Sequence, residues 1–101
     1  MSYTKVTPQE AMEMMNDNVI ILDVRSQEDF DEGHIRNAIL LPHTEIKEKA
    51  ESSFPDKDAK ILVYCRTGFR SDLASNDLVS LGYTAVYNMG GLDDWTGEVV
   101  K

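Results

Sequence analysis

The sequence predicts an α/β fold in which a mostly parallel central sheet has helices on both faces. Short apolar runs alternate along the chain with longer segments whose apolar residues recur at helical spacing. Gly, Pro or Asn residues stand at the ends of most of these segments. Apolar runs without polar alternation are typical of strands covered on both faces. Their alternation with helices is typical of a parallel sheet.

Four apolar runs are the predicted strands. The first three consist almost entirely of Val, Ile, Leu, Ala and Tyr, so we expect them to be buried. The four strands cover residues 19–22, 38–41, 60–64 and 84–87.

Helices are predicted between and after these strands. The first begins with a capping box formed by Thr7 and Glu10, with Pro8 at the first helical position, and ends at residues 16–18. The others are a short capped helix over residues 26–30 that ends at Gly33, a charged surface helix over residues 43–52, an amphipathic helix over residues 71–81 closed by Gly82, and a short helix from Gly90 through Trp95.

Length and charge limit what the chain can be. Its 101 residues predict one domain that spans residues 1–101. With 10 Lys and Arg residues against 18 Asp and Glu residues, the net charge is −8. This charge argues against a nucleic-acid partner and against binding to an anionic membrane. A small charged domain of this kind is expected to be a monomer.

The single cysteine and the short apolar runs indicate the compartment. One cysteine forms no internal disulfide and cannot build a cysteine-rich zinc site. The apolar runs are too short to cross a bilayer, and the N-terminus lacks the apolar core of a signal peptide. We therefore expect a cytoplasmic protein that needs neither a metal nor a cofactor.

A six-residue loop follows the third predicted strand and leads into the amphipathic helix. It begins with Cys65 and contains Arg66 and Arg70, two of the four arginines in the chain. A strand end, a helix N-terminus and nearby arginines each favour the thiolate form of a cysteine. Gly68 lets the loop curl with positive φ, so that successive N–H groups point inward.

The same loop residues also allow a less specific interpretation, in which Cys65 is unreactive. A lone cysteine is most often an inert, small apolar side chain, and two loop arginines can be merely solvated. Since the glycine and the helix start coincide with the cysteine and both arginines, we interpret Cys65 as a reactive nucleophile.

Five motifs follow one another along the chain: residues 22–25; residues 28–30 followed by 33–35 and 38–42; residues 65–71; Gly82-Tyr83; and residues 88–91 with Trp95. In this order and spacing they resemble the motifs of the rhodanese family across nearly the whole chain, from Thr7 to Trp95. Two departures stand out: Arg36-Asn37 replaces a common Pro-Gly pair, and the bulky Phe69 stands where small or polar residues are common. Asn tolerates the left-handed conformation that such a turn requires, and Phe69 suggests an apolar wall or a partner contact.

The resemblance implies sulfur transfer by double displacement. The donor would be a small anion, thiosulfate or a persulfide. With thiosulfate, the Cys65 thiolate would attack the outer sulfur, sulfite would leave, and Cys65 would carry a persulfide. The loop N–H groups would stabilise its anionic terminal sulfur. The acceptor would be cyanide, a thiol or a partner protein. Arg66 and Arg70 would bind the donor oxygens, and the substrate-binding loop as a whole comprises Arg66, Thr67, Gly68, Phe69, Arg70 and Ser71.

Two residues at the end of the first predicted strand are expected to support the loop. Asp23 could accept hydrogen bonds from the loop, pair with Arg70, or cap its own turn. The resemblance pairs Arg25 with Glu28.

Two other classes of protein remain open. Cysteine-based phosphatases and arsenate reductases also use a strand–loop–helix anion site, but five residues separate their cysteine and arginine. Four residues separate Cys65 from Arg70, which makes a smaller ring. The other class is the non-catalytic rhodanese-like interaction module, which often lacks the cysteine. Thiosulfate turnover distinguishes all three.

Overall fold

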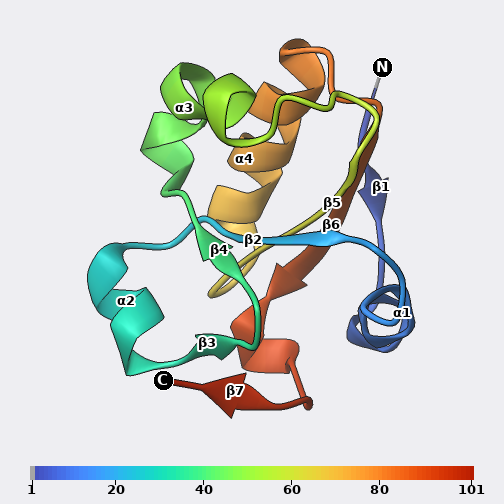
Figure 1. Ribbon diagram of the computed structural model, residues 1–101. Helices are drawn as coiled ribbons and strands as arrows, with labels where there is room; N and C mark the ends of the chain where they lie inside the picture. Colours follow the sequence, from blue (N-terminus) through green and yellow to red (C-terminus); the bar gives the residue numbers. More distant parts are fainter. Residues whose placement is uncertain (1) are drawn as a thin grey trace.

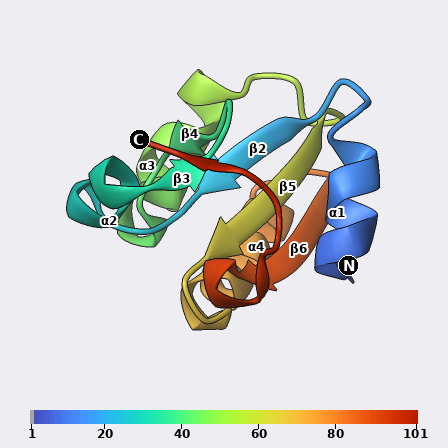
Figure 2. The ribbon, with the colours of Figure 1, turned by 90° about the horizontal axis from the view of Figure 1, so that it is seen from below.

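Five parallel strands form the central sheet of the protein. The structure is a computed structural model that describes residues 2–101. The strands lie side by side in the order β1, β6, β5, β2, β4, and Figure 2 shows the last four fanning across the sheet. This arrangement confirms the predicted mostly parallel α/β fold. The strand bounds are β1 Thr4–Lys5, β2 Ile20–Asp23, β4 Ile39–Leu40, β5 Lys60–Cys65 and β6 Ala85–Gly91.

Helices cover both faces of this sheet, as predicted. Figure 1 shows α3 (Ile46–Ser53) and α4 (Phe69–Ser80) on one side and α1 (Pro8–Met14) on the other. Each face of the sheet packs against its helices through an apolar core, and alternate residues of β5 point into the two cores. Those facing α3 and α4 are Ile61, Val63 and Cys65, and those facing α1 are Leu62 and Tyr64.

A second, two-stranded sheet lies near the C-terminus. Here β3 (His34–Ile35) pairs antiparallel with β7 (Val99–Val100). The sequence did not predict β1, β3 or β7. Each has only two residues, which is too short for the alternation that marks a strand.

The helix ends follow the predicted caps. Thr7 and Glu10 form the reciprocal capping box of α1. Ser26 caps α2 (Gln27–Glu32), which ends at Gly33. At the end of α4 the N–H of Gly82 donates to the Val79 carbonyl and the N–H of Tyr83 to the Leu78 carbonyl, which is the hydrogen-bond pattern of a glycine C-cap. These bonds are local, so the sequence alone was enough to place them.

The amphipathic helix predicted over residues 71–81 begins earlier, at Phe69, so the last two residues of the predicted loop belong to α4. Three other predicted elements also differ. The run over residues 38–41 forms a short edge strand, β4, rather than a buried one, and Ile39 is 47% exposed. The predicted helix over residues 43–52 divides into a 3₁₀ turn, η1 (His43–Glu45), and α3, which buries Ile46 and Ala50. The last predicted strand continues to Gly91, so that the final short helix, η2 (Leu92–Asp94), begins only after it. The exposure of β4 follows from its place at the edge of the sheet, where β2 is its only neighbour in the strand order of the described residues.

The turn after β3 takes the form expected from its sequence. Asn37 has φ of +71°, and among the described residues it is the only non-glycine residue with a positive φ. Asn thus takes the left-handed position for which glycine is the usual choice.

A buried ion pair joins β2 to β5 and to β3. The Arg25 guanidinium donates to both carboxylate oxygens of Asp23, the shortest contact being 2.7 Å, and its Nη2 also donates to the Gly33 carbonyl at 2.6 Å. The Tyr64 hydroxyl donates to Asp23 Oδ2 at 2.7 Å and accepts the N–H of Ile35. Burial, and then the charge of Asp23, raise the pKa of Tyr64, so this hydroxyl stays protonated and remains a donor.

These contacts decide between the roles expected for the two supporting residues. Asp23 bonds to Arg25 and Tyr64, and not to Arg70 or to the Cys65 loop. The alternative that Asp23 caps its own turn is confirmed, because its Oδ1 accepts the N–H of Arg25 at 2.9 Å. Arg25 pairs with Asp23 instead of Glu28. The side chains of Asp23 and Arg25 are 0% and 5% exposed, and such burial requires that the two charges compensate each other directly.

Within residues 2–101, no helix combines the length and the apolar character that crossing a membrane requires.

We expect Asp23→Ala to lower the free energy of unfolding by about 3–5 kcal/mol, because it leaves the buried Arg25 charge unpaired. Urea denaturation followed by circular dichroism measures this change. Glu98→Ala is the matched control. It removes one carboxylate from the exposed Arg36–Glu98 pair, whose side chains are 60% and 62% exposed, and should leave the urea midpoint essentially unchanged. Equal effects of the two substitutions would contradict this account.

Candidate active site

Cys65 is the last residue of β5, and its side chain is held by the main chain that follows it. The side chain is 1% exposed, and its Sγ accepts the N–H of Gly68 at 2.9 Å and the N–H of Ser71 at 3.3 Å. Hydrogen bonds from N–H groups favour a negatively charged sulfur over a neutral one. The two bonds enclose the sulfur from the side of α4.

The first turn of α4 is shaped to present these donors. Gly68 precedes the helix with φ of +106° and offers no capping side chain. The N–H groups at this helix end are therefore free to point at Sγ. The Ser71 hydroxyl donates to the Gly68 carbonyl at 2.9 Å and closes the turn.

Strand β6 approaches the loop at a point where only glycine fits. Gly91 lies opposite Cys65 in the β5–β6 ladder. A Cβ atom on Gly91 would lie 2.2 Å from the carbonyl oxygen of Arg66. The same carbonyl accepts the N–H of Asp93 at 3.2 Å, so the loop is bound to the segment after β6.

A register shift in β6 makes this approach possible. Val63 pairs with Asn88, but the next residue, Tyr64, pairs with Gly90, so that Met89 is an extra residue in the ladder. The Asn88 side-chain oxygen accepts the N–H of Gly90 at 2.8 Å. The sequence places Gly90-Gly91 in the last motif of the resemblance and at the start of a helix, but it does not predict the bulge, because a bulge of this kind leaves no clear pattern in the sequence.

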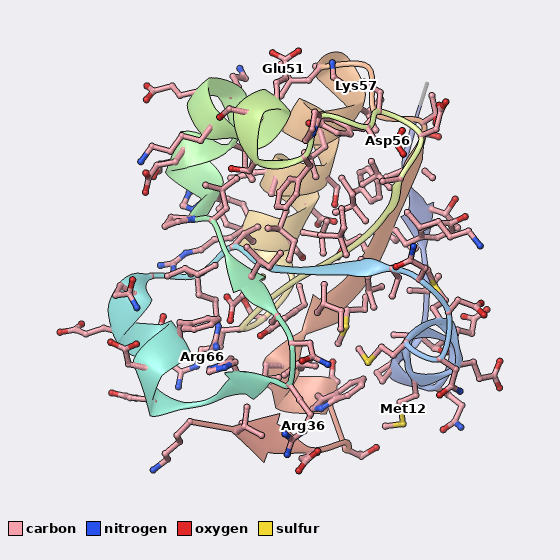
Figure 3. All side chains as sticks on the ribbon, in the orientation of Figure 1. Met12, Arg36, Glu51, Asp56, Lys57 and Arg66 are labelled. Atoms are coloured by element: carbon pink, nitrogen blue, oxygen red, sulfur yellow. The ribbon has the colours of Figure 1, made fainter. Side chains whose placement is uncertain are left out.

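A pocket of about 300 Å³ opens in front of Cys65. The predicted site residues Arg66, Thr67, Phe69 and Arg70 line it, together with Asp29 of α2. Figure 3 shows Arg66 beside α2. The structure thus brings the whole predicted loop around one space, with Gly68 and Ser71 reaching the sulfur through their N–H groups. Asp23 and Arg25 do not line it.

Asp29 is a pocket residue that sequence reasoning missed. Asp29 lies in the first turn of α2, just beyond the carboxyl end of β2. Because ligands bind beyond the carboxyl ends of parallel strands, this position could have identified Asp29 as a pocket residue.

Two exposed arginines line the pocket beside the Cys65 sulfur. Among the described residues, neither Arg66 nor Arg70 forms a salt bridge, and both are exposed. Their guanidinium groups therefore remain available for a ligand. Over residues 2–101, no cluster of three His, Cys, Asp or Glu side chains is arranged as metal ligands.

Known proteins share this sequence and this fold. The rhodanese-like domain matches residues 7–98. The thiosulfate sulfurtransferase PspE of Escherichia coli is 41% identical over 80 residues, which cover 79% of this chain and 77% of that protein. The thiosulfate sulfurtransferase GlpE of Coxiella burnetii is 35% identical over 97 residues, covering 94% and 89%.

Solved structures agree with these relatives. A rhodanese with anions from Escherichia coli has a TM-score of 0.76 at 39% identity, covering 81% of this chain and 96% of that one. A rhodanese-related protein from Thermoplasma volcanium has a TM-score of 0.83 at 31% identity, covering 97% and 98%.

We expect Gly91→Ala to displace the loop, because the new methyl group would overlap the Arg66 carbonyl and both partners are main chain. The free energy of unfolding should fall by about 1–3 kcal/mol. The amide NMR signals of Gly68 and Ser71, whose N–H groups bond to Sγ, should shift. Gly33→Ala is the control: its methyl would meet the Val99 side chain, which can move. Unchanged Gly68 and Ser71 signals in Gly91→Ala would contradict the close approach.

Proposed function

The chain belongs to the rhodanese-like domain family and is a sulfurtransferase, and we propose that it transfers sulfur through a persulfide on Cys65. The donor is thiosulfate or a similar small anionic sulfur compound, and the acceptor is cyanide, a thiol or a partner protein. One observation carries the proposal. A buried cysteine sulfur accepts two main-chain N–H groups at the base of a pocket lined by two unpaired arginines.

In the first step, the Cys65 thiolate attacks the outer sulfur of thiosulfate. A bond forms between Sγ and that sulfur, and the bond between the two sulfur atoms of thiosulfate breaks. Its electron pair leaves with sulfite. Arg66 and Arg70 bind the oxygens of the donor and offset the charge on the departing sulfite.

In the second step, the acceptor attacks the outer sulfur of the persulfide and Cys65 leaves as a thiolate. The N–H groups of Gly68 and Ser71, which bond to Sγ in the structure, stabilise this leaving group. Because the thiolate is itself the nucleophile, no separate general base is needed. Thr67 and Phe69 form the wall of the pocket.

The size of the loop favours sulfur transfer over phosphate chemistry. Four residues lie between Cys65 and Arg70, and the N–H groups of the loop converge on one atom. A phosphoryl group needs three oxygens bound at once, and a misplacement of about 1 Å can lower a rate by roughly 100-fold. The interaction-module alternative is disfavoured because the chain retains a cysteine with these donors.

We also propose that residues 1–101 act as one catalytic domain, as a monomer in the cytoplasm. The proposed mechanism needs Cys65 in its reduced form, and a reducing compartment keeps cysteines reduced.

Incubation with thiosulfate should add about 32 Da, one sulfur atom, to the intact mass of the protein, because an activated thiolate forms a stable persulfide. Cys65→Ser should lose both the added mass and the release of sulfite, since a hydroxyl group is a poor nucleophile at neutral pH. Intact-mass spectrometry and a sulfite assay measure the two effects.

The same two proteins should be assayed for hydrolysis of an aryl phosphate and for arsenate reduction with a thiol. We expect negligible rates for both reactions. Phosphate hydrolysis that depends on Cys65 and exceeds sulfur transfer would promote the phosphatase alternative. No reaction of any kind, with no added sulfur, would support the interaction module.

Arg70→Ala should lower kcat/KM for thiosulfate by about 10- to 150-fold, because the donor loses a charge-assisted contact. Steady-state kinetics with cyanide as acceptor measure this change. Arg36→Ala is the control, since Arg36 pairs with Glu98 away from the Cys65 pocket and its loss changes the net charge by the same amount. Equal kcat/KM values for the two variants would show that Arg70 does not bind the donor and is only a solvated residue.

A further inference from the structure

A second groove lies next to the Cys65 pocket, on the other side of Phe69. Its volume is about 460 Å³, against about 300 Å³ for the Cys65 pocket, which is within the range of small-molecule sites. Thr67 and Phe69 line both spaces. Phe69 is 71% exposed and forms a ridge between them. The groove extends from this ridge to β1.

The groove contains one cation and one anion, each without a charged partner. Lys5 of β1 and Asp72 of α4 both line it, and neither forms a salt bridge among the described residues. Asp72 is held in place by neutral donors: its Oδ1 accepts the Tyr3 hydroxyl at 2.8 Å and the Asn88 amide at 2.7 Å. Its negative charge is therefore fixed in position but not neutralised.

The rest of the lining includes apolar side chains. Val6 and Met89 line the groove together with Phe69. A groove with balanced charge has no preference for a dianion, whereas the Cys65 pocket has two arginines. The two spaces are therefore suited to different molecules, and thiosulfate belongs in the Cys65 pocket.

We propose that the groove binds the sulfur acceptor, and that this acceptor is a thiol with both a carboxylate and an ammonium group, such as an amino-acid or peptide thiol. The inference rests on the proposed function and specifies the acceptor class for the same site. Lys5 pairs with the carboxylate, Asp72 pairs with the ammonium group, and the apolar lining contacts the hydrocarbon part. To reach Cys65 from the groove, the acceptor must pass the Phe69 ridge. Because Cys65 is 1% exposed, only a narrow, extended part of the acceptor, its thiol arm, can do so.

The transfer balances without another reactant. The acceptor sulfur attacks the outer sulfur of the persulfide and forms a new S–S bond. The bond between Sγ and the outer sulfur breaks, and its electron pair remains on Cys65 as the thiolate. The thiol proton of the acceptor moves from the attacking sulfur to the transferred sulfur, so the product is a hydropersulfide of the acceptor.

The test separates loading from discharge. The protein is loaded with thiosulfate, freed of excess donor, and checked for the added sulfur by mass. Discharge is then timed with glutathione as the zwitterionic thiol, 2-mercaptoethanol as a neutral thiol, and cyanide, each below saturation. The variants are Lys5→Glu, Lys5→Arg and, as the charge-matched control, Lys60→Glu. Lys60 is an exposed lysine at the opposite end of the sheet.

Lys5→Glu should slow discharge by glutathione about three- to tenfold and leave discharge by 2-mercaptoethanol and cyanide unchanged. Lys5→Arg should retain the wild-type rate, and Lys60→Glu should not distinguish the three acceptors. Equal glutathione rates in Lys5→Glu and Lys60→Glu would overturn the proposal, as would an equal loss with all three acceptors. Failure of the loading step itself would instead refute the Cys65 persulfide.

Discussion

The contact between two stretches of main chain, at Gly91 and at the Arg66 carbonyl, determines the geometry of the Cys65 loop. With no side chain on Gly91, β6 can lie directly against the residue that follows Cys65. The loop must then curl away from the sheet and enter α4, and this path aims the N–H groups of Gly68 and Ser71 at Sγ. The chemistry of the site thus depends on main-chain packing at the end of a sheet. The side chains of the loop add charge and shape to an arrangement that already exists.

The arginines explain how an acidic protein can offer the anion site that we propose. The net charge is −8, which on its own repels a dianion. Arg25 is buried against Asp23, and Arg36 pairs with Glu98 on the surface. The remaining two, Arg66 and Arg70, line the pocket of Cys65. The two nearby arginines therefore outweigh the negative net charge of the protein at the Cys65 pocket.

The two ends of neighbouring strands have separate tasks, although both carry ionisable residues. At the end of β2, Asp23 and Arg25 neutralise each other and bind Tyr64, which fixes β2, β3 and β5 relative to one another. At the end of β5, Cys65 is satisfied by main-chain donors and its arginines remain free. A charged residue at the carboxyl end of a parallel strand can thus be structural, and its partners rather than its position distinguish the two cases.

Much of the fold and of the site could be predicted from the sequence, because the deciding interactions are local. The capping box at Thr7, the glycine cap at Gly82 and the loop from Cys65 into α4 each involve residues within a few positions of one another. Tertiary structure alone decided the partner of Arg25, the fit of Gly91 against Arg66, the edge position of β4 and the place of Lys5 beside the loop. These features depend on how distant segments pack and pair across the sheet, or on which side chain fills a buried space. Hydrophobic pattern and residue preference describe one segment at a time, so they contain no information on which distant segment it will meet.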